Sequence, residues 1–179
     1  IEPGSHVHTH NCALHEFERA YEFGTAVRAV DSPASHATFQ GIVRADGRVA
    51  TRNYVAILSS VNCSATVSRA IADAFKPNPV TGEGLLSDFP NIDGVVALTH
   101  RTGCGHASAG DAIDLLRRTM GGFARHPNFA ATFMVGLGCE ANQVNDLITI
   151  EGLKKARTLQ SFTIQETGGT RRTIEHGIA

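Results

Sequence analysis

Short runs of apolar residues alternate along the chain with segments in which apolar residues recur every three or four positions. Residues 54–60 (YVAILSS), 92–99 (IDGVVALT) and 130–137 (AATFMVGL) are nearly continuous apolar runs, and 159–165 (LQSFTIQ) is a weaker fourth run. Runs of this length are typical of strands that other elements cover on both faces. We therefore predict four β-strands at these positions.

The segments between these runs have the period of amphipathic helices. One apolar face is formed in each of three segments, by Val67, Ile71, Ala74 and Phe75, by Ile113, Leu116 and Met120, and by Val144, Leu147 and Ile148. A fourth helix is expected after the sequence ETGGT, with Thr170 as its N-cap. Alternating strands and helices favour parallel strands joined by right-handed crossovers. The predicted fold is α/β, a Rossmann-like three-layer domain with a mostly parallel sheet.

The first part of the chain differs from the rest. Residues 1–38 have no clear period and are rich in His, Ser and Pro, so we interpret them as a tail and linker, and residues 39–179 as the α/β domain. The chain stops at Ala179 within the predicted fourth helix. We therefore expect it to be a piece of a longer protein.

Composition excludes several classes of function. Hydrophobic residues make up 42% and charged residues 18% of the chain, which is typical of a globular protein. The net charge of -1 argues against a nucleic-acid partner, since no basic excess exists to neutralise phosphates. No apolar stretch approaches the roughly 18 residues of a membrane span, so we expect no membrane partner. The four cysteines form no CxxC pair, which argues against a zinc ribbon and favours a reducing cytoplasm.

Three of the four cysteines follow the carboxyl ends of predicted strands. The residues at these strand ends are Cys63 after the first strand, His100, Cys104 and His106 after the second, and Cys139 and Glu140 after the third. A single cysteine at a strand end is more often a small buried hydrophobic residue, but three at equivalent positions favour a functional edge. The carboxyl ends of parallel strands share one edge, where ligands bind.

The chemistry of these side chains points to a metal. Thiolates bind soft metals, imidazole binds iron or zinc, and carboxylates prefer harder ions. The set could hold Fe2+ or Mn2+, or three thiols could hold an iron–sulfur cluster, and the spacing does not choose among them. Arg52 and Asn53, just before the first strand, are candidates for substrate binding. Arg52 would clamp a carboxylate with two hydrogen bonds, although a plain surface arginine is an equal alternative.

Long segments of the sequence resemble one family. The segments GIVRADGRVATRNYVAILSSVNCSA, FPNIDGVVALTHRTGCG, HPNFAATFMVGLGCEANQ and FTIQETGGTRRTIEHG closely resemble parts of the altronate/galactarate dehydratase family of sugar-acid dehydratases. The resemblance runs from about Gln40 to the end of the chain. GSHVHTHN is similar to the end of the family's small antifreeze-like N-terminal domain (SAF domain), so residues 1–38 would be the tail of that domain.

The resemblance implies a hydro-lyase that converts a sugar acid such as altronate or galactarate to a 2-keto-3-deoxy acid with the help of ferrous iron or a comparable divalent metal. The residues at the matching positions imply Cys63, Cys104 and Cys139 as metal ligands. Candidates for proton transfer are His100, His106 and Glu140, with the acid and the base unassigned. Family members are several hundred residues long, so we expect no activity from this chain alone and a homo-oligomer in the full-length enzyme.

Three alternatives remain. The chain could be a non-catalytic domain that binds a small acid or regulates, or a sulfo-lyase relative that acts on sulfolactate. It could also be a structural piece whose cysteines merely pack. Bound metal separates the enzyme from the structural piece, and turnover by a longer chain separates it from the binding domain.

Overall fold

The structure is a computed structural model that describes residue 32, residues 35–105 and residues 107–179. The chain divides into two units, Ile1–Thr38 and Phe39–Ala179, and the second unit contains the predicted α/β domain. The interpretation of residues 1–38 as the tail of a small N-terminal domain falls almost wholly outside the described residues and stays a prediction.

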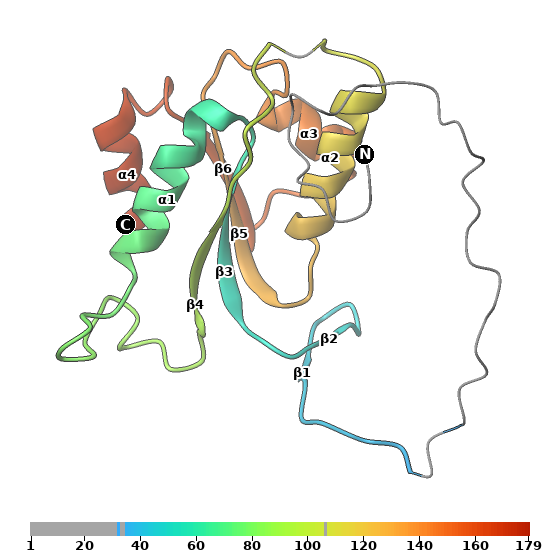
Figure 1. The fold of residues 1–179 in the computed structure, drawn as a ribbon, viewed down its shortest axis with the longest axis vertical. Coiled ribbons are helices and arrows are strands. Elements are labelled where there is room, and N and C mark those ends of the chain that lie inside the picture. Colours follow the sequence, from blue (N-terminus) through green and yellow to red (C-terminus); the bar gives the residue numbers. More distant parts are fainter. Residues whose placement is uncertain (1–31, 33–34, 106) are drawn as a thin grey trace, which may run out of the picture. The chain divides into compact units, whose positions relative to one another are not determined.

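Four parallel strands form the central sheet of the second unit (Figure 1). They are β3 (Tyr54–Ser59), β4 (Gly94–Leu98), β5 (Phe129–Gly136) and β6 (Leu159–Thr163), in the spatial order β4-β3-β5-β6. All three pairings are parallel. Each strand begins and ends within two residues of the predicted bounds, so the predicted α/β class with a parallel sheet is confirmed.

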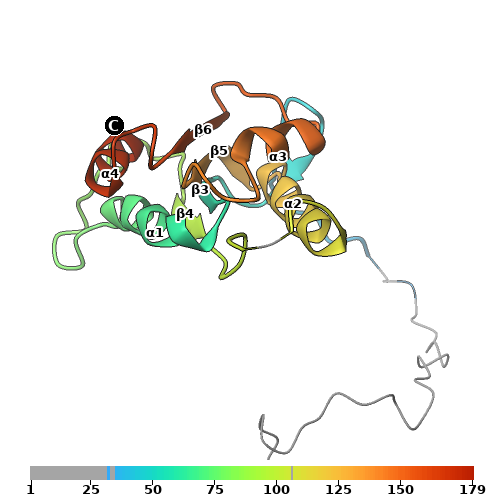
Figure 2. The same cartoon turned by 90° about the horizontal axis from the view of Figure 1, so that it is seen from above.

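Helices cover both faces of this sheet (Figure 2). α1 (Ala65–Ala74) and α4 (Thr170–Ile178) lie side by side on one face, and α2 (Asp111–Ala124) and α3 (Val144–Ile150) lie on the other. The three layers of the prediction are therefore present. No helix within the described ranges is long and apolar enough to cross a membrane.

The sheet separates two apolar clusters. Successive residues of a strand point to opposite faces, so Leu58 packs with the α2–α3 layer and Ile57 packs with α1. Met134 and Leu147 belong to the first cluster, and Ile71 of α1 belongs to the second. Complete burial of each such side chain contributes about 1.5–3 kcal/mol, so both faces stabilise the central strands.

Two local features add to the prediction or correct it. The chain turns at Asp46-Gly47, with Gly47 at a φ of 82°, and this turn joins two short antiparallel strands, β1 (Ile42–Val43) and β2 (Val49–Ala50). The prediction of Thr170 as the N-cap of the last helix is wrong. Gly169 is the N-cap, at a φ of 109°, a conformation that a side chain disfavours.

Candidate functional site

The order of the strands marks the carboxyl edge of the sheet as the expected place for a ligand. The chain leaves β3 for α1 on one face and leaves β5 for α3 on the opposite face (Figure 2). Loops that diverge in this way from neighbouring parallel strands leave a crevice at their carboxyl ends, where ligands of open α/β sheets bind.

The three cysteines lie on this edge. Cys63 belongs to a short 3-10 helix, η1 (Asn62–Ser64), directly after β3, and Cys104 and Cys139 lie in the loops that follow β4 and β5. All three side chains are exposed. Their predicted placement along one edge of the sheet is confirmed, whereas their role as metal ligands stays a prediction.

The thiols are close enough to influence one another. Partial desolvation, a hydrogen bond with the Cys104 thiol and the charges of Cys104 and Cys139 together raise the pKa of the Cys63 thiol above its ordinary value. The Cys63 Sγ also lies 3.6 Å from the Asn62 Oδ1, which accepts a hydrogen bond from it. A set of thiols suits a soft metal ion. Among the described residues, however, no three His, Cys, Asp or Glu side chains are arranged to hold one.

The loops that carry Cys63 and Cys104 pack directly on each other. The backbone N–H of Asn62 donates to the carbonyl oxygen of Thr102 at 2.8 Å. Gly103 has a φ of 94°, and a Cβ there would lie 2.9 Å from the carbonyl oxygen of Ser60 and 3.1 Å from the Cα of Val61. Glycine therefore permits the close approach of the two loops.

Glu140 connects the Cys139 loop to the end of β3. Its carboxylate is buried, and Oε1 accepts hydrogen bonds from the Ser60 hydroxyl at 2.7 Å and the Leu137 backbone N–H at 3.1 Å. Oε2 accepts a hydrogen bond from the Gly138 N–H at 2.6 Å. A Cβ at Gly136 would lie 2.5 Å from Oε1, so glycine makes room for the carboxylate. Both oxygens of this predicted catalytic residue thus hold the loop in place.

A second buried polar side chain also contacts the end of β3 beside this carboxylate. Asn142 is fully buried, its Nδ2 donates to the Ser60 carbonyl oxygen at 3.2 Å, and its Oδ1 accepts from the Arg117 Nε at 3.3 Å. Sequence reasoning missed Ser60, Asn142 and Arg117. One signal was available, because Arg117 interrupts the apolar face that Ile113 and Met120 define on α2.

His100 also lies at the carboxyl edge, just after β4. Its Nε2 is 2.9 Å from the carbonyl oxygen of Ser59, and its Nδ1 is 3.2 Å from the backbone N–H of Thr102. These two contacts fit the tautomer in which Nδ1 accepts the amide hydrogen and Nε2 donates to the Ser59 carbonyl oxygen. His106 lies outside the described residues, so its role stays a prediction.

Arg52 and Asn53 lie at the opposite edge of the sheet. They precede β3, whose six residues separate them from the thiol edge by roughly 20 Å. Asn53 Nδ2 donates to the Asn91 carbonyl oxygen at 2.6 Å, and its backbone N–H donates to Asp93 Oδ2 at 2.6 Å. Arg52 is exposed. Within this domain the structure does not bring these two predicted substrate residues together with the thiols.

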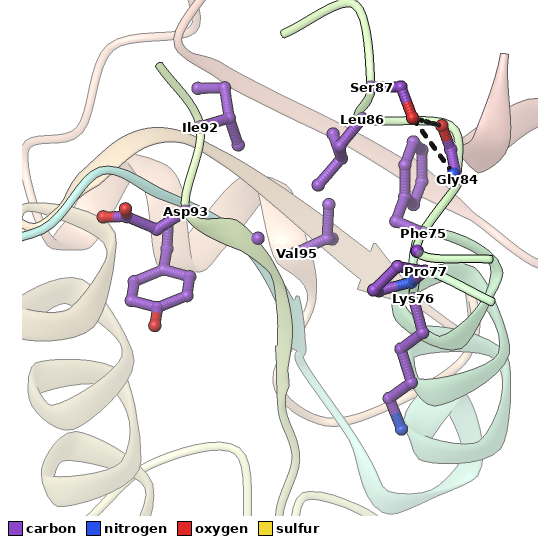
Figure 3. A pocket seen from close by; sticks show the side chains of 12 residues that line it. Phe75, Lys76, Pro77, Gly84, Leu86, Ser87, Ile92, Asp93 and Val95 are labelled. Carbon is purple, nitrogen blue, oxygen red and sulfur yellow. Dashed lines mark hydrogen bonds between the residues drawn. The ribbon is translucent and has the colours of Figure 1, made fainter. Parts of the chain in front are cut away.

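One cavity lies at the amino edge of the sheet, opposite the thiols. It measures about 410 Å³ and lies near the amino ends of β3 and β4, between Phe75, Leu86 and Val95 (Figure 3). The charged groups in its lining already have partners, since Lys76 pairs with Asp73 at 2.6 Å and Asp93 accepts from the Asn53 backbone. This cavity therefore offers little for binding a charged substrate.

A smaller cavity lies beside β6. It measures about 160 Å³ and is lined by polar side chains that include Gln143, Lys155, Gln165 and Glu166. Gln143 donates to the carbonyl oxygens of Gly138 and Glu140 at 3.2 and 2.8 Å, which connects this cavity to the Cys139 loop.

Sequence comparisons with known proteins point to one family. Residues 41–179 match the family model described as "D-galactarate dehydratase/Altronate hydrolase, second domain". The chain is 33% identical over 146 residues to "Altronate dehydratase" of Escherichia coli (strain K12), which covers 80% of this chain and 28% of the relative. It is 27% identical over 172 residues to "Altronate dehydratase" of Bacillus subtilis (strain 168), which covers 93% of this chain and 32% of the relative.

The chain thus spans about a third of the length of the curated relatives it matches. No solved structure matches it significantly. The family model covers most of the chain and the whole of the described α/β sheet. The chain therefore belongs to the D-galactarate dehydratase/altronate hydrolase family, in which it corresponds to the second domain.

Proposed function

We propose that this chain is the thiol-bearing domain of a metal-dependent hydro-lyase that converts a sugar acid such as altronate or galactarate to a 2-keto-3-deoxy acid. The observation that carries the proposal is the placement of three exposed cysteines at the carboxyl edge of the sheet, in a chain of this family. Because the chain spans about a third of its relatives, we also propose that other domains of the family complete the substrate site.

The metal in this proposal is Fe2+ or Mn2+, held by Cys63, Cys104 and Cys139. When bound, such a cation would supply positive charge to the substrate carboxylate, which makes the neighbouring C–H more acidic. The support for this step is the chemistry of the thiols, not an assembled set of ligands, since the described side chains form none.

The chain's own residues would position these groups and move protons. His100 is one candidate for proton transfer at the substrate, and its Nε2 would have to leave the Ser59 carbonyl oxygen to act there. His106 is the other candidate for proton transfer. We propose that Glu140 acts by positioning the Cys139 loop, because both of its oxygens already accept hydrogen bonds from the protein.

Metal analysis of single variants tests the proposal. The chain is loaded with Fe2+ without oxygen, desalted, and assayed for retained iron and for absorption from thiolate-to-iron charge transfer. Cys63→Ser, Cys104→Ser and Cys139→Ser should each lose most of the iron, because a hydroxyl is a poorer ligand for iron than a thiolate. Cys12→Ser is the matched control and should retain it. Unchanged iron in all three variants would refute the metal part.

Activity needs a separate assay. The chain joined to the remaining domains of the family should form the 2-keto-3-deoxy acid from altronate or galactarate, and Cys139→Ser should lose most of that turnover. Release of sulfite from sulfolactate, without dehydration of either sugar acid, would identify the sulfo-lyase alternative instead.

A non-catalytic small-acid-binding domain is the second candidate. The lack of an assembled metal-ligand set among the described residues favours it. Calorimetry with galactarate, in the presence of a chelator, separates the two. Binding that persists without metal and without turnover in the longer chain would support this second candidate.

A further inference from the structure

We propose that Cys63 and Cys104 form a reversible disulfide, so that the thiol edge of the sheet is a site of oxidation by peroxides. The disulfide itself does not depend on the proposed function. Its consequence for metal binding, described below, rests on that function.

The backbone brings the two cysteines together. β3 and β4 are parallel neighbours, with Leu58 opposite Leu98 at their carboxyl ends. Beyond that pair, the Asn62 N–H donates to the Thr102 carbonyl oxygen at 2.8 Å, one residue before Cys63 and two before Cys104. A backbone hydrogen bond holds the α-carbons of its two residues roughly 5 Å apart, and a disulfide needs α-carbons within about 7 Å.

The influence of each thiol on Cys63 agrees with this pairing. A hydrogen bond with the Cys104 thiol and the charge of Cys104 both raise the pKa of Cys63, whereas Cys139 acts on it only through charge. Cys139 also belongs to a loop that Glu140 holds on the other side of β3. Cys104 is therefore the partner that Cys63 meets.

Both thiols are accessible to a small oxidant, because both side chains are exposed. Oxidation of cysteine needs such access, and a second thiol nearby converts the first oxidation product to a disulfide. The close packing of Gly103 on Ser60 and Val61 keeps the two loops adjacent, so the second step would be intramolecular.

The reaction balances with hydrogen peroxide as the oxidant. One thiolate attacks a peroxide oxygen, the O–O bond breaks, and a sulfenic acid and hydroxide form; the hydroxide takes up the proton that the thiol released and becomes water. The second thiolate attacks the sulfenic sulfur, the S–S bond forms, and the S–O oxygen leaves as a second water. Two sulfurs lose two electrons in total to the peroxide, and a dithiol reductant reverses the step.

The proposed function gives the disulfide a consequence. It removes two of the three proposed metal ligands, so the oxidised chain should retain no iron. A sugar-acid dehydratase built on this edge would then be switched off by peroxide and restored by a dithiol.

The experiment maps disulfides in the metal-free chain. Reduced protein is exposed to hydrogen peroxide, unreacted thiols are blocked with N-ethylmaleimide, and peptides are identified by mass spectrometry. We expect a linked Cys63–Cys104 peptide about 2 Da lighter than its two free peptides together, and its disappearance after dithiothreitol. Cys139→Ser and Cys12→Ser should retain this peptide, and Cys104→Ser should lose it completely.

Three results would overturn the disulfide. They are a link between any other pair of cysteines, recovery of both residues only as blocked thiols, and recovery of both only as sulfinic or sulfonic acids. Retained iron is then compared between reduced and oxidised chain. Equal iron in both overturns the consequence, whereas no iron in either, with the linked peptide present, shows that the metal proposal fails and the disulfide stands.

Discussion

Replacing Glu140 by Gln tests whether a buried carboxylate holds the edge of the site together. Gln keeps the size of the side chain and one acceptor oxygen, but it turns the other oxygen into an NH2 group. In the protein, three donors converge on the carboxylate: the Ser60 hydroxyl, the Leu137 N–H and the Gly138 N–H. Whichever way the amide is turned, its NH2 faces at least one backbone N–H.

The magnitude follows from the bonds that are lost. A hydrogen bond to a charged group contributes about 1.5–3 kcal/mol, and a buried N–H left without an acceptor costs about 1–3 kcal/mol. Glu140 is only 4% exposed, so water does not replace the lost partner. We expect Glu140→Gln to lower the free energy of unfolding by about 2–4 kcal/mol, against the about 5–15 kcal/mol of a typical domain.

Urea unfolding of the purified chain measures this change. The midpoint concentration should fall while the slope of the free energy against urea stays the same, since the surface exposed on unfolding is unchanged. Glu175→Gln is the matched control. Glu175 pairs with Arg171 at 2.8 Å on the surface, and loss of such an exposed pair costs about 0–1 kcal/mol.

A free energy of unfolding for Glu140→Gln within about 0.5 kcal/mol of the wild-type value, the range of ordinary surface substitutions, would refute the positioning role of Glu140. The carboxylate would then have no positioning role in the folded protein. Glu140 would then again be a candidate for proton transfer.

Three further outcomes are expected. Gly103→Ala should lower the free energy of unfolding in urea more than Gly105→Ala does. Both glycines have positive φ, but only at Gly103 would the new Cβ meet backbone atoms within 3.1 Å. Equal losses of stability would contradict the close packing of the loops. Ser60→Ala and Ser64→Ala each remove a buried hydroxyl, but only Ser60→Ala should weaken iron retention, by roughly tenfold. Equal iron retention by the two variants would show that Ser60 does not support the site. The pH at which the rate of Cys63 alkylation by iodoacetamide is half-maximal should be higher than for a free cysteine peptide. The raised pKa of Cys63 means that its thiolate forms only at a higher pH. A lower half-maximal pH would contradict the thiol interactions.

The strands and the thiol edge could be predicted because their signals are local. An apolar run such as residues 130–137 marks a buried strand whatever surrounds it, and a parallel sheet then places every strand end on one edge. The placement of Cys63, Cys104 and Cys139 on that edge needed only these two steps. Helix α2 was recognised from its period, although it extends to Ala124, beyond the last predicted apolar position at Met120.

The polar contacts behind the edge could not be predicted in the same way. Ser60 and Glu140 are 80 residues apart, and Ser60 and Asn142 are 82 apart. No periodic pattern relates such positions, and a buried hydroxyl or amide has the same sequence signature as an exposed one. The wrong N-cap at Thr170 has a related cause, because the choice of Gly169 depends on a backbone angle and not on a side-chain donor.

Ser60 lies next to residues that hold each of the three loops that carry a thiol. Its hydroxyl donates to Glu140 of the Cys139 loop, its carbonyl oxygen accepts from Asn142, and the same carbonyl oxygen lies where a Cβ at Gly103 would approach. Ser60 directly follows β3, which has a neighbouring strand on each side and is held by both. The loops that carry the exposed thiols thus all depend on one buried residue beside a strand that is held on both sides. A site that depends on the distances between three loops needs one residue that holds all of them. Packing of the cysteines alone does not account for such a residue.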